Sequence, residues 1–342
     1  MAKRAHSAPL RPAGEAAEGS PARQDDAIRN CSVERTLDIV SDVWSFLVLR
    51  ECYLGVRRFD QIQSVLGLPR STLSERLGLL VDQGILRRER YSEAPPRDEY
   101  RLTEMGLDLY LVMLTLLRFG DDWLSGGRSE PLTLVHSTCG QPCRAESCCS
   151  HCGGAIAAHE VSYRDGPGAG HAQAGVRRRR RRAADLGQLE RGRPSSASRA
   201  LRIIGDRWSF LVLRECFFGV TRFDAFRARL GVASNILADR LARLVEAGVL
   251  RRRRYQDSPE RFEYRLSAMG MALYLPMIEM LRFGDRWLSE APPLLLTHRT
   301  CGHDFLPVVC CDHCGEALTA RDLRFQLNYP APLAARPRAQ LA

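Results

Sequence analysis

The apolar positions between residues 58 and 102 form two helical stripes, which are followed by a hairpin pattern. The first stripe, which stops at Gly67, consists of Phe59, Ile62, Val65 and Leu66. The second stripe, which stops at Gly84, consists of Leu73, Leu77, Leu80 and Val81. Short segments at 85–86 and 100–102 then flank a tip rich in arginine and proline, as the arms of a hairpin do. Helix, tight turn, helix and basic hairpin predict a winged helix-turn-helix.

The same pattern returns between residues 222 and 266. A shift of 164 positions carries Trp44 onto Trp208 and Gly84 onto Gly248. Such a repeat indicates a duplicated domain, and the expected fold class is mainly α with small β-wings (α+β). The predicted divisions are a disordered tail (1–30), a first winged helix domain (31–125), a zinc-ribbon-like module (131–162), a basic flexible linker (163–198), a second winged helix domain (199–290), a second zinc-ribbon-like module (294–325) and a tail (326–342).

Several segments shared by the two copies resemble the HxlR-type winged-helix transcriptional regulators. They include DVWSFLVLRECYLGVRRFD with its counterpart GDRWSFLVLRECFFGVTRFD, EYRLTEMG with EYRLSAMG, and RFGDDW with RFGDRW. The resemblance implies a dimer that binds operator DNA and pairs through its terminal helices. Because this chain carries two copies, the homodimer of a single-domain family member does not follow directly.

The helix predicted after the first wing is apolar nearly all round. It begins at Thr103 and continues through Leu107, Leu111, Leu114 and Leu117 towards Trp123. A helix of this kind must be covered, either by its own domain or by a partner subunit. Both an intramolecular pseudo-dimer and a homodimer through the terminal helices are therefore open at this point.

Charge and hydropathy narrow the class of function. The formal net charge is +10 and the pI is near 9.2, which favours a polyanionic partner such as double-stranded DNA. No apolar run reaches the roughly 18 residues of a membrane span, and the first 30 residues contain no continuous apolar segment, so we expect a cytoplasmic protein without a secretory signal. A phosphate loop, a nucleophile elbow and an HExxH motif are all missing, which argues against an enzyme.

Nine of the twelve cysteines fall into two groups, and each group contains the spacing H-x2-C-x9-C-x2-C. Four soft or borderline ligands at this spacing are typical of a closed, structural Zn²⁺ site. We expect two zinc sites, one in each module, whose ligands are His136, Cys139, Cys149 and Cys152 in the first and His298, Cys301, Cys311 and Cys314 in the second. The exact ligand choice stays open, because other candidates lie nearby, namely Cys143, Cys148, Cys310 and His303.

Two further kinds of cysteine lie outside these groups. Cys52 and Cys216 occupy matching places in an apolar helix and are expected to be core residues. Cys31 has no counterpart, since Ser195 stands at the matching place. With Arg29 and Arg35 nearby, Cys31 is a candidate redox sensor, and a purely structural role is the alternative.

The exposed positions of the second helix and the wing of each copy are the candidate DNA contacts. We expect the helices to enter the major groove and the wing arginines to contact the backbone or the minor groove. In the first copy these residues are Arg70, Ser71, Thr72, Ser74, Glu75, Arg76, Arg87, Arg88, Arg90 and Arg97. In the second copy they are Ser234, Asn235, Ile236, Asp239, Arg240, Arg251, Arg252, Arg253, Arg254 and Arg261. Arg76 is expected to hold a phosphate.

The function favoured by the sequence is a sequence-specific transcriptional regulator with two non-identical reading helices, which predicts an asymmetric operator. The alternative is a zinc-stabilised protein-interaction module that does not bind specific DNA. The linker arginines 177–182 either form a solvated charge run or tether DNA without sequence preference. The operator sequence, the regulated genes, the sign of regulation and the effector do not follow from the sequence.

Overall fold

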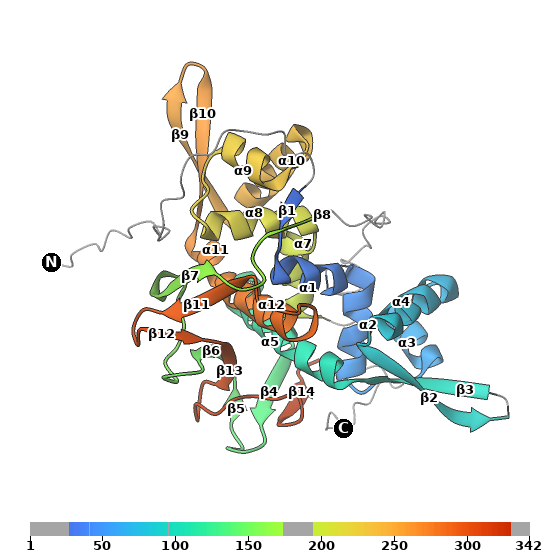
Figure 1. Cartoon of the computed structure of the whole chain (residues 1–342). Coiled ribbons are helices and arrows are strands. Elements are labelled where there is room, and N and C mark those ends of the chain that lie inside the picture. Colours follow the sequence, from blue (N-terminus) through green and yellow to red (C-terminus); the bar gives the residue numbers. More distant parts are fainter. Residues whose placement is uncertain (1–26, 41, 95, 174–193, 330–342) are drawn as a thin grey trace.

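The computed structural model describes residues 27–40, 42–94, 96–173 and 194–329 (Figure 1). The arginine run at 177–182 and most of the two predicted tails lie outside these residues. The helices of the first copy are α1 (Ser32–Val40), α2 (Val43–Tyr53), α3 (Phe59–Leu66), α4 (Arg70–Asp82) and α5 (Glu104–Leu124). Its wing consists of β2 (Leu86–Glu93) and β3 (Pro96–Leu102), which pair antiparallel.

The second copy repeats this order with one difference. Its helices are α7 (Ser196–Ile204), α8 (Arg207–Phe217), α9 (Phe223–Leu230), α10 (Ser234–Glu246), α11 (Ala268–Ala272) and α12 (Tyr274–Trp287), and its wing consists of β9 (Leu250–Asp257) and β10 (Glu260–Leu266). The long terminal helix is continuous as α5 but divided into α11 and α12. Pro276 stands where the first copy has Val112, and a proline inside a helix removes a backbone donor and crowds the preceding turn.

Local chemistry explains where these helices begin and end. The Asp42 carboxylate accepts a hydrogen bond from the Ser45 amide and caps α2, and Asp206 caps α8 in the same way. Gly67 ends α3 in the left-handed conformation, with φ of 63°, and Gly231 does the same for α9. The predicted pair of winged helices is thus confirmed.

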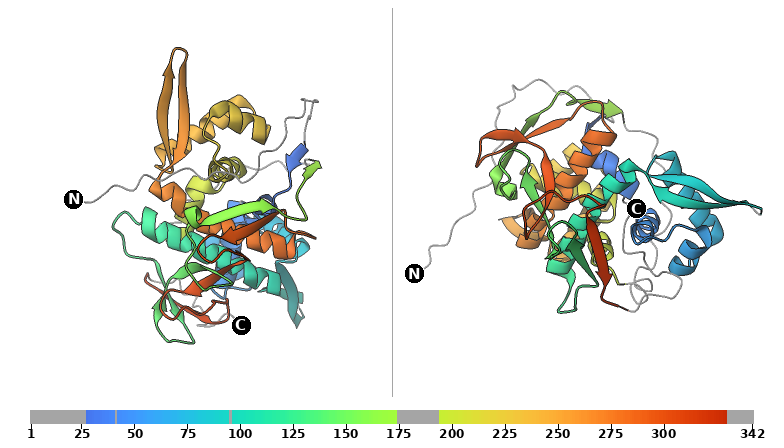
Figure 2. Two further views of the ribbon diagram at one scale, coloured as in Figure 1. Left: turned by 60° about the vertical axis from the view of Figure 1, so that its left-hand side comes forward. Right: turned by 90° about the horizontal axis from the view of Figure 1, so that it is seen from below.

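The two wings project away from the helical centre in different directions (Figures 1 and 2). That centre is built from helices of both copies. The terminal helices α5 and α12 contact each other, while α1 packs on α12 and α7 packs on α5. Each copy therefore places its first helix against the terminal helix of the other copy. The covering of the apolar terminal helices, which the sequence left open, occurs here within one chain.

The segments after the winged helices do not form two self-contained modules, which corrects that expectation. Three antiparallel strand pairs connect the copies (Figure 1). They are β4 (Leu132–His136) with β14 (Leu323–Leu327), β6 (Ala145–Cys149) with β13 (Pro307–Cys311), and β7 (Val161–Asp165) with β11 (Leu294–His298). Two short strands, β5 (Pro142–Cys143) and β12 (His303–Phe305), join β4 and β11 from their own copies. The ligand spacing is identical in both copies, so the sequence did not indicate that the modules pair with each other.

The predicted boundaries of the tail and linker also shift. Part of the predicted tail forms β1 (Ala27–Arg29), which pairs with β8 (His171–Gln173) in the predicted linker. Residues 163–165 of the predicted linker belong to β7, and residues 196–198 belong to α7. Residues 326–327 of the predicted C-terminal tail belong to β14. Within the part of the chain that the structure describes, no helix is long and apolar enough to span a membrane.

Candidate DNA-reading surface and metal centres

The two predicted recognition helices, α4 and α10, present their polar positions to solvent. Leu73, Leu77 and Leu80 of α4 are fully buried, and the intervening positions carry the candidates Arg70, Ser71, Ser74 and Glu75 on the exposed side, with Thr72 half-buried. In α10 the exposed candidates are Ser234, Asn235 and Asp239, and Ile236 is half-buried. The predicted amphipathic division of both helices is therefore present.

Arg76 and Arg240 differ from the other candidates. The Arg76 guanidinium lies 3.2 Å from the carboxylate of Asp42, and only 12% of its side chain is exposed. Arg240 lies 2.8 Å from Asp206 at the matching place. Each arginine thus ties a recognition helix to the capping residue of α2 or α8. A phosphate contact by either residue has to compete with that internal ion pair, which the sequence did not indicate.

The wing arginines are exposed, but the two wings differ in charge. The segment 86–102 contains five arginines and four carboxylates, whereas the segment 250–266 contains six arginines and three carboxylates. In the first wing Arg87 pairs with Glu89, and both Arg88 and Arg90 pair with Asp98. In the second wing Arg253 and Arg254 have carboxylate partners, while Arg252 lies over the Phe262 ring. The second wing is the more basic of the two.

All eight predicted metal ligands gather into two clusters, but each cluster draws on both copies. One cluster consists of His136, Cys139, Cys311 and Cys314, and the other of Cys149, Cys152, His298 and Cys301; within each, the ligand atoms lie within 4.8 Å of one another. The prediction of one complete site in each module was therefore wrong in its grouping. In three dimensions, the His-x2-Cys of one copy meets the Cys-x2-Cys of the other.

The separations between ligand atoms fit a tetrahedral metal. Nδ1 of His136 lies 3.5 Å from Sγ of Cys139 and 3.3 Å from Sγ of Cys314, and Cys139 lies 4.0 Å from Cys311. A tetrahedron with Zn–S bonds of about 2.3 Å and Zn–N bonds of about 2.0 Å has edges of roughly 3.5–3.8 Å. A disulfide needs an S–S distance of about 2.05 Å, so these thiols are not bonded to each other.

The backbone of the two Cys-x2-Cys turns favours thiolates. Burial raises the pKa of the Cys149 thiol, but hydrogen bonds from the amides of Cys152 and His151 outweigh it and bring that pKa below its usual value. Cys311 has the same balance in the other cluster. The glycine after each turn has a positive φ, as at Gly153 with 71°, a conformation that glycine adopts without strain.

The alternative ligands lie outside both clusters. Cys148 and Cys310 precede Cys149 and Cys311 on their strands, and successive strand residues point to opposite faces. Cys310 instead contacts the Val308 carbonyl oxygen at 3.5 Å. The His303 ring lies against that of His151, with 3.6 Å between ring centroids and 40° between the ring planes. Cys143 lies beside Cys311, where burial raises its pKa to about 12.

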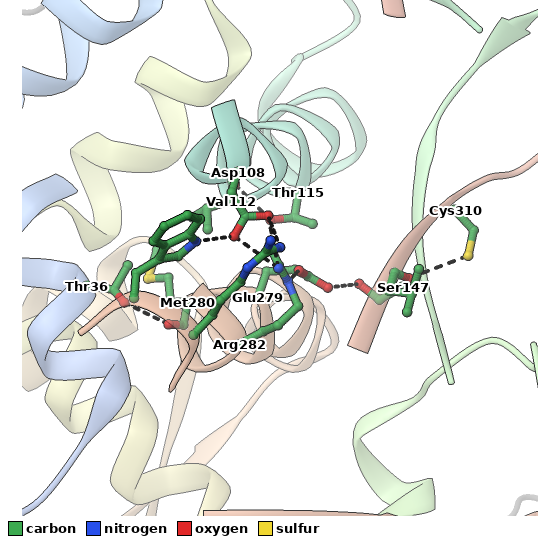
Figure 3. Close-up of polar contacts among 12 residues, drawn as sticks. Thr36, Asp108, Val112, Thr115, Ser147, Glu279, Met280, Arg282 and Cys310 are labelled. Atoms are coloured by element: carbon green, nitrogen blue, oxygen red, sulfur yellow. Dashed lines mark hydrogen bonds and ion pairs between the residues drawn. The ribbon is translucent and has the colours of Figure 1, made fainter. Parts of the chain in front are cut away.

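A buried polar network connects the terminal helices of the two copies (Figure 3). The Arg282 guanidinium donates to Glu279 at 2.9 Å and to Asp108 of α5 at 3.0 Å. The Trp287 indole also donates to Asp108, at 2.7 Å, and the Ser147 hydroxyl lies 3.4 Å from the Glu279 carboxylate. Glu279 is fully buried, and this burial raises its pKa although Arg282 counteracts the effect. No pattern in the sequence indicates this network.

Cys31 lies at the start of α1, where only 8% of its surface is exposed. Two arginines of the second copy, Arg207 and Arg214, interact with the Cys31 thiol. Burial lowers the pKa of Arg214, but Cys31 and Glu215 outweigh this effect and raise it. A sensing function of Cys31 stays a prediction. Cys52 and Cys216 lie in α2 and α8, where burial raises the pKa of Cys52 to about 12 and that of Cys216 still further.

Comparison with known proteins identifies the family. The sequence model of the HxlR-like helix-turn-helix family matches residues 39–127 and 203–292, just over half of the chain. The chain belongs to this family. The two matches coincide with the two winged helices, so the predicted tandem HxlR-type architecture is confirmed, and family membership indicates a regulator rather than an enzyme.

Relatives of the HxlR-like chain are regulators of the same kind. An uncharacterised HTH-type transcriptional regulator of Mycobacterium tuberculosis is 45% identical over 137 residues, which cover 40% of this chain and 87% of that protein. One of Synechocystis is 40% identical over 95 residues, covering 28% of this chain and 70% of that protein. A solved Pseudomonas aeruginosa protein, described as a candidate transcription factor, is 36% identical with a TM-score of 0.24; the match covers 27% of this chain and 63% of that protein.

Proposed function

We propose that this HxlR-like chain is a sequence-specific regulator that binds double-stranded DNA with both winged helices of one chain. The observation that carries the proposal is the pairing of the two copies through their terminal helices and three strand pairs. A single-domain HTH regulator has to dimerise to present two reading helices. Here the two copies supply both helices, with α4 and α10 in the major groove and the wings on the backbone.

We further propose that Zn²⁺ occupies both Cys/His clusters. Three thiolates and one imidazole form a donor set that zinc prefers, and four protein ligands leave no position for a substrate. Such a metal has a structural function. Because each cluster takes ligands from both copies, the metal also fixes one copy to the other, and its binding free energy contributes to the stability of the pair.

The network around Arg282 disfavours a pair of two second copies. At the places of Asp108 and Glu279, the other copy has Ala272 and Thr115. In a pair of two second copies Arg282 would face Ala272 in place of Asp108 and would keep only Glu279 of its own helix as a partner. In a pair of two first copies Arg118 would stand at the place of Arg282 and could meet Asp108, so the network argues only against a pair of second copies.

The predicted operator is asymmetric for the same reason. Asn235 and Ile236 of α10 stand where α4 has Ser71 and Thr72, so the two helices offer different groups to the bases. Asparagine can read adenine with two hydrogen bonds, and isoleucine can contact a thymine methyl group. We expect two different half-sites with centres separated by about one helical turn, ~34 Å.

The test is a selection of genomic DNA fragments bound by the purified full-length protein, combined with its mass in solution. An enriched motif without a palindrome, bound by a monomer, is expected. A palindrome bound by two chains would retain the regulator and reject pairing within one chain. If no fragment is enriched and the binding of bulk DNA depends little on salt, the chain is a protein-interaction module, since phosphate contacts always make binding salt-dependent.

A further inference from the structure

A pocket lies at the seam between the copies, and its lining contains no residue of the recognition helices and none of the eight clustered ligands. It has a volume of about 60 Å³, and its walls are almost entirely apolar. The first copy contributes β7 and the start of α1, and the second contributes α8, α12 and β11. The walls include the aromatic rings of Tyr163, Phe217 and Tyr274 and the aliphatic side chains of Val161, Ile278 and Leu296.

The one charged side chain in this lining is Arg214, and it is incompletely paired. Its Nε and Nη2 donate to the Glu215 carboxylate at 3.0 and 2.7 Å. Its Nη1 is buried and has no hydrogen-bond partner among the described residues, although only 6% of the side chain is exposed. The Cys31 thiol beside it is only a weak acceptor. A buried guanidinium donor without a partner is costly, so this group is suited to an anionic acceptor.

The surrounding charges favour an anion as well. Glu215, the partner of Arg214, also pairs with Arg229 at 3.3 Å, so two guanidinium groups share one carboxylate. Arg29 adds a third positive charge, 5.5 Å from the centroid of the Phe218 ring, and pairs with the exposed Asp165. Apart from Arg214 and Cys31 the walls offer few polar groups, so a ligand with a single charged end is the best match.

We propose that this pocket binds a small monocarboxylate whose carboxylate accepts a hydrogen bond from Arg214 Nη1 and whose hydrocarbon end fills the apolar part. One water needs roughly 10–15 Å³ of such a volume, so the pocket has room for about four to six non-hydrogen atoms. This is the size of a short, branched aliphatic acid. A fused aromatic acid is too large.

Such a ligand would link the winged helices of the two copies mechanically. The pocket is lined by α8, which packs against α10, and by elements of the first copy on the opposite wall. Occupancy therefore ties α8 to the first copy and favours one relative orientation of the two winged helices. This consequence for DNA rests on the proposed function, whereas ligand binding itself does not and can be measured without DNA.

The experiment titrates the full-length, metal-loaded protein by calorimetry with isobutyrate, isobutyramide and 1-naphthoate. We expect isobutyrate to bind with one site per chain and roughly tenfold more tightly than the neutral amide, because a hydrogen bond to a charged acceptor is the stronger one. The naphthoate should not bind. Equal binding of acid and amide, or no saturable binding of isobutyrate at millimolar concentrations, would overturn the proposal.

Two pairs of variants locate the site. Arg214→Lys should weaken isobutyrate binding about tenfold, because lysine cannot pair with Glu215 and reach the ligand together. Arg50→Lys, at the matching place of the first copy, should leave it unchanged. Ala158→Phe fills the pocket, and Ala320→Phe is its matched control. Equal losses in Arg214→Lys and Arg50→Lys would reject the site, a result that stays decisive even if the phenylalanine variants fail to fold.

Discussion

At the centre of the molecule, each terminal helix touches the first helix of the other copy at a glycine. A Cβ built on Gly120 would lie 2.0 Å from the Ser196 carbonyl oxygen, and one built on Gly284 would lie 2.3 Å from that of Ser32. Both glycines belong to the RFGD motif, so a feature visible in the sequence has its explanation in the contact between copies. Neither glycine is needed for its own helix, where alanine is preferred.

Gly284→Ala and Gly120→Ala should each lower the free energy of unfolding by about 1–3 kcal/mol, because the added methyl group forces two backbones apart. Urea unfolding of the metal-loaded protein measures the change. Gly78→Ala in α4 is the control: nothing lies within 4 Å of its Cβ, so we expect a small gain in stability. A loss at Gly78 equal to that at Gly284 would contradict the explanation.

We expect the aspartates that follow these glycines to make the pairing pH-dependent. Burial raises the pKa of Asp121 to about 6, opposed by the Ser196 hydroxyl, and raises that of Asp285 to about 6, opposed by Ser32. The usual pKa in an unfolded chain is lower, so the folded protein binds additional protons between about pH 4 and pH 6. These two carboxyl groups therefore contribute stability that grows as the pH falls through 6.

Lowering the pH from 7.5 to 5.5 should stabilise the wild type relative to the double variant Asp121→Asn/Asp285→Asn. Both groups are only half-buried, so solvent screening limits the expected difference to about 1 kcal/mol. Unfolding at both pH values, with saturating zinc, gives the difference, because protonation of the metal ligands affects both proteins alike. An identical pH dependence of the two proteins would show that these carboxylates titrate normally.

At the scale of elements, the sequence predicted most of the secondary structure and all eight clustered ligands, but not the pairing of the modules. Hydrophobic periodicity is local, and it located α1 to α5, the wings and their counterparts. The partner of Cys139 is decided by contacts between segments more than a hundred residues apart. Since the two copies carry the same ligand spacing, pairing within a copy and pairing between copies produce the same pattern. The Arg282 network is equally non-local, because it needs α5 and α12 to be adjacent.

Metal stoichiometry distinguishes the two pairings of ligands. In the arrangement described above, Cys139→Ser/Cys311→Ser damages one cluster and should retain about one zinc per chain. Cys139→Ser/Cys149→Ser damages both clusters and should retain almost none. Self-contained modules would give the opposite result. The measurement is zinc content by mass spectrometry after gel filtration without chelator.

At the scale of the whole molecule, the two winged helices differ in the charge of their wings as well as in the exposed residues of their recognition helices. The second wing combines more arginines with fewer carboxylates, and its Arg251 and Arg252 have no ion-pair partner among the described residues. Their counterparts Arg87 and Arg88 pair with Glu89 and Asp98. An arginine already paired within the protein gains less from a phosphate, so the second wing should contribute more to DNA affinity.

Arg251→Ala/Arg252→Ala should therefore weaken operator binding more than Arg87→Ala/Arg88→Ala. If both arginines of the second wing contact phosphates, the slope of log K against the logarithm of the salt concentration should become about two units less steep in that variant. The change should be smaller for the variant of the first wing. Fluorescence anisotropy at several salt concentrations measures both slopes. Equal slopes for the two variants would contradict the assigned asymmetry.

If both winged helices of one chain bind one operator, as we propose, the strand pairs and shared clusters that join the copies also set how operator occupancy responds to the abundance of the protein. A dimeric regulator dissociates on dilution, and below its dissociation constant its operator occupancy falls with the square of the protein concentration. Two winged helices on one chain remain together at any dilution, because their effective concentration relative to each other is fixed by the chain. Occupancy then follows the first power of the number of molecules. A cell that makes very few copies of this chain retains a graded response where a dissociating dimer would give nearly none.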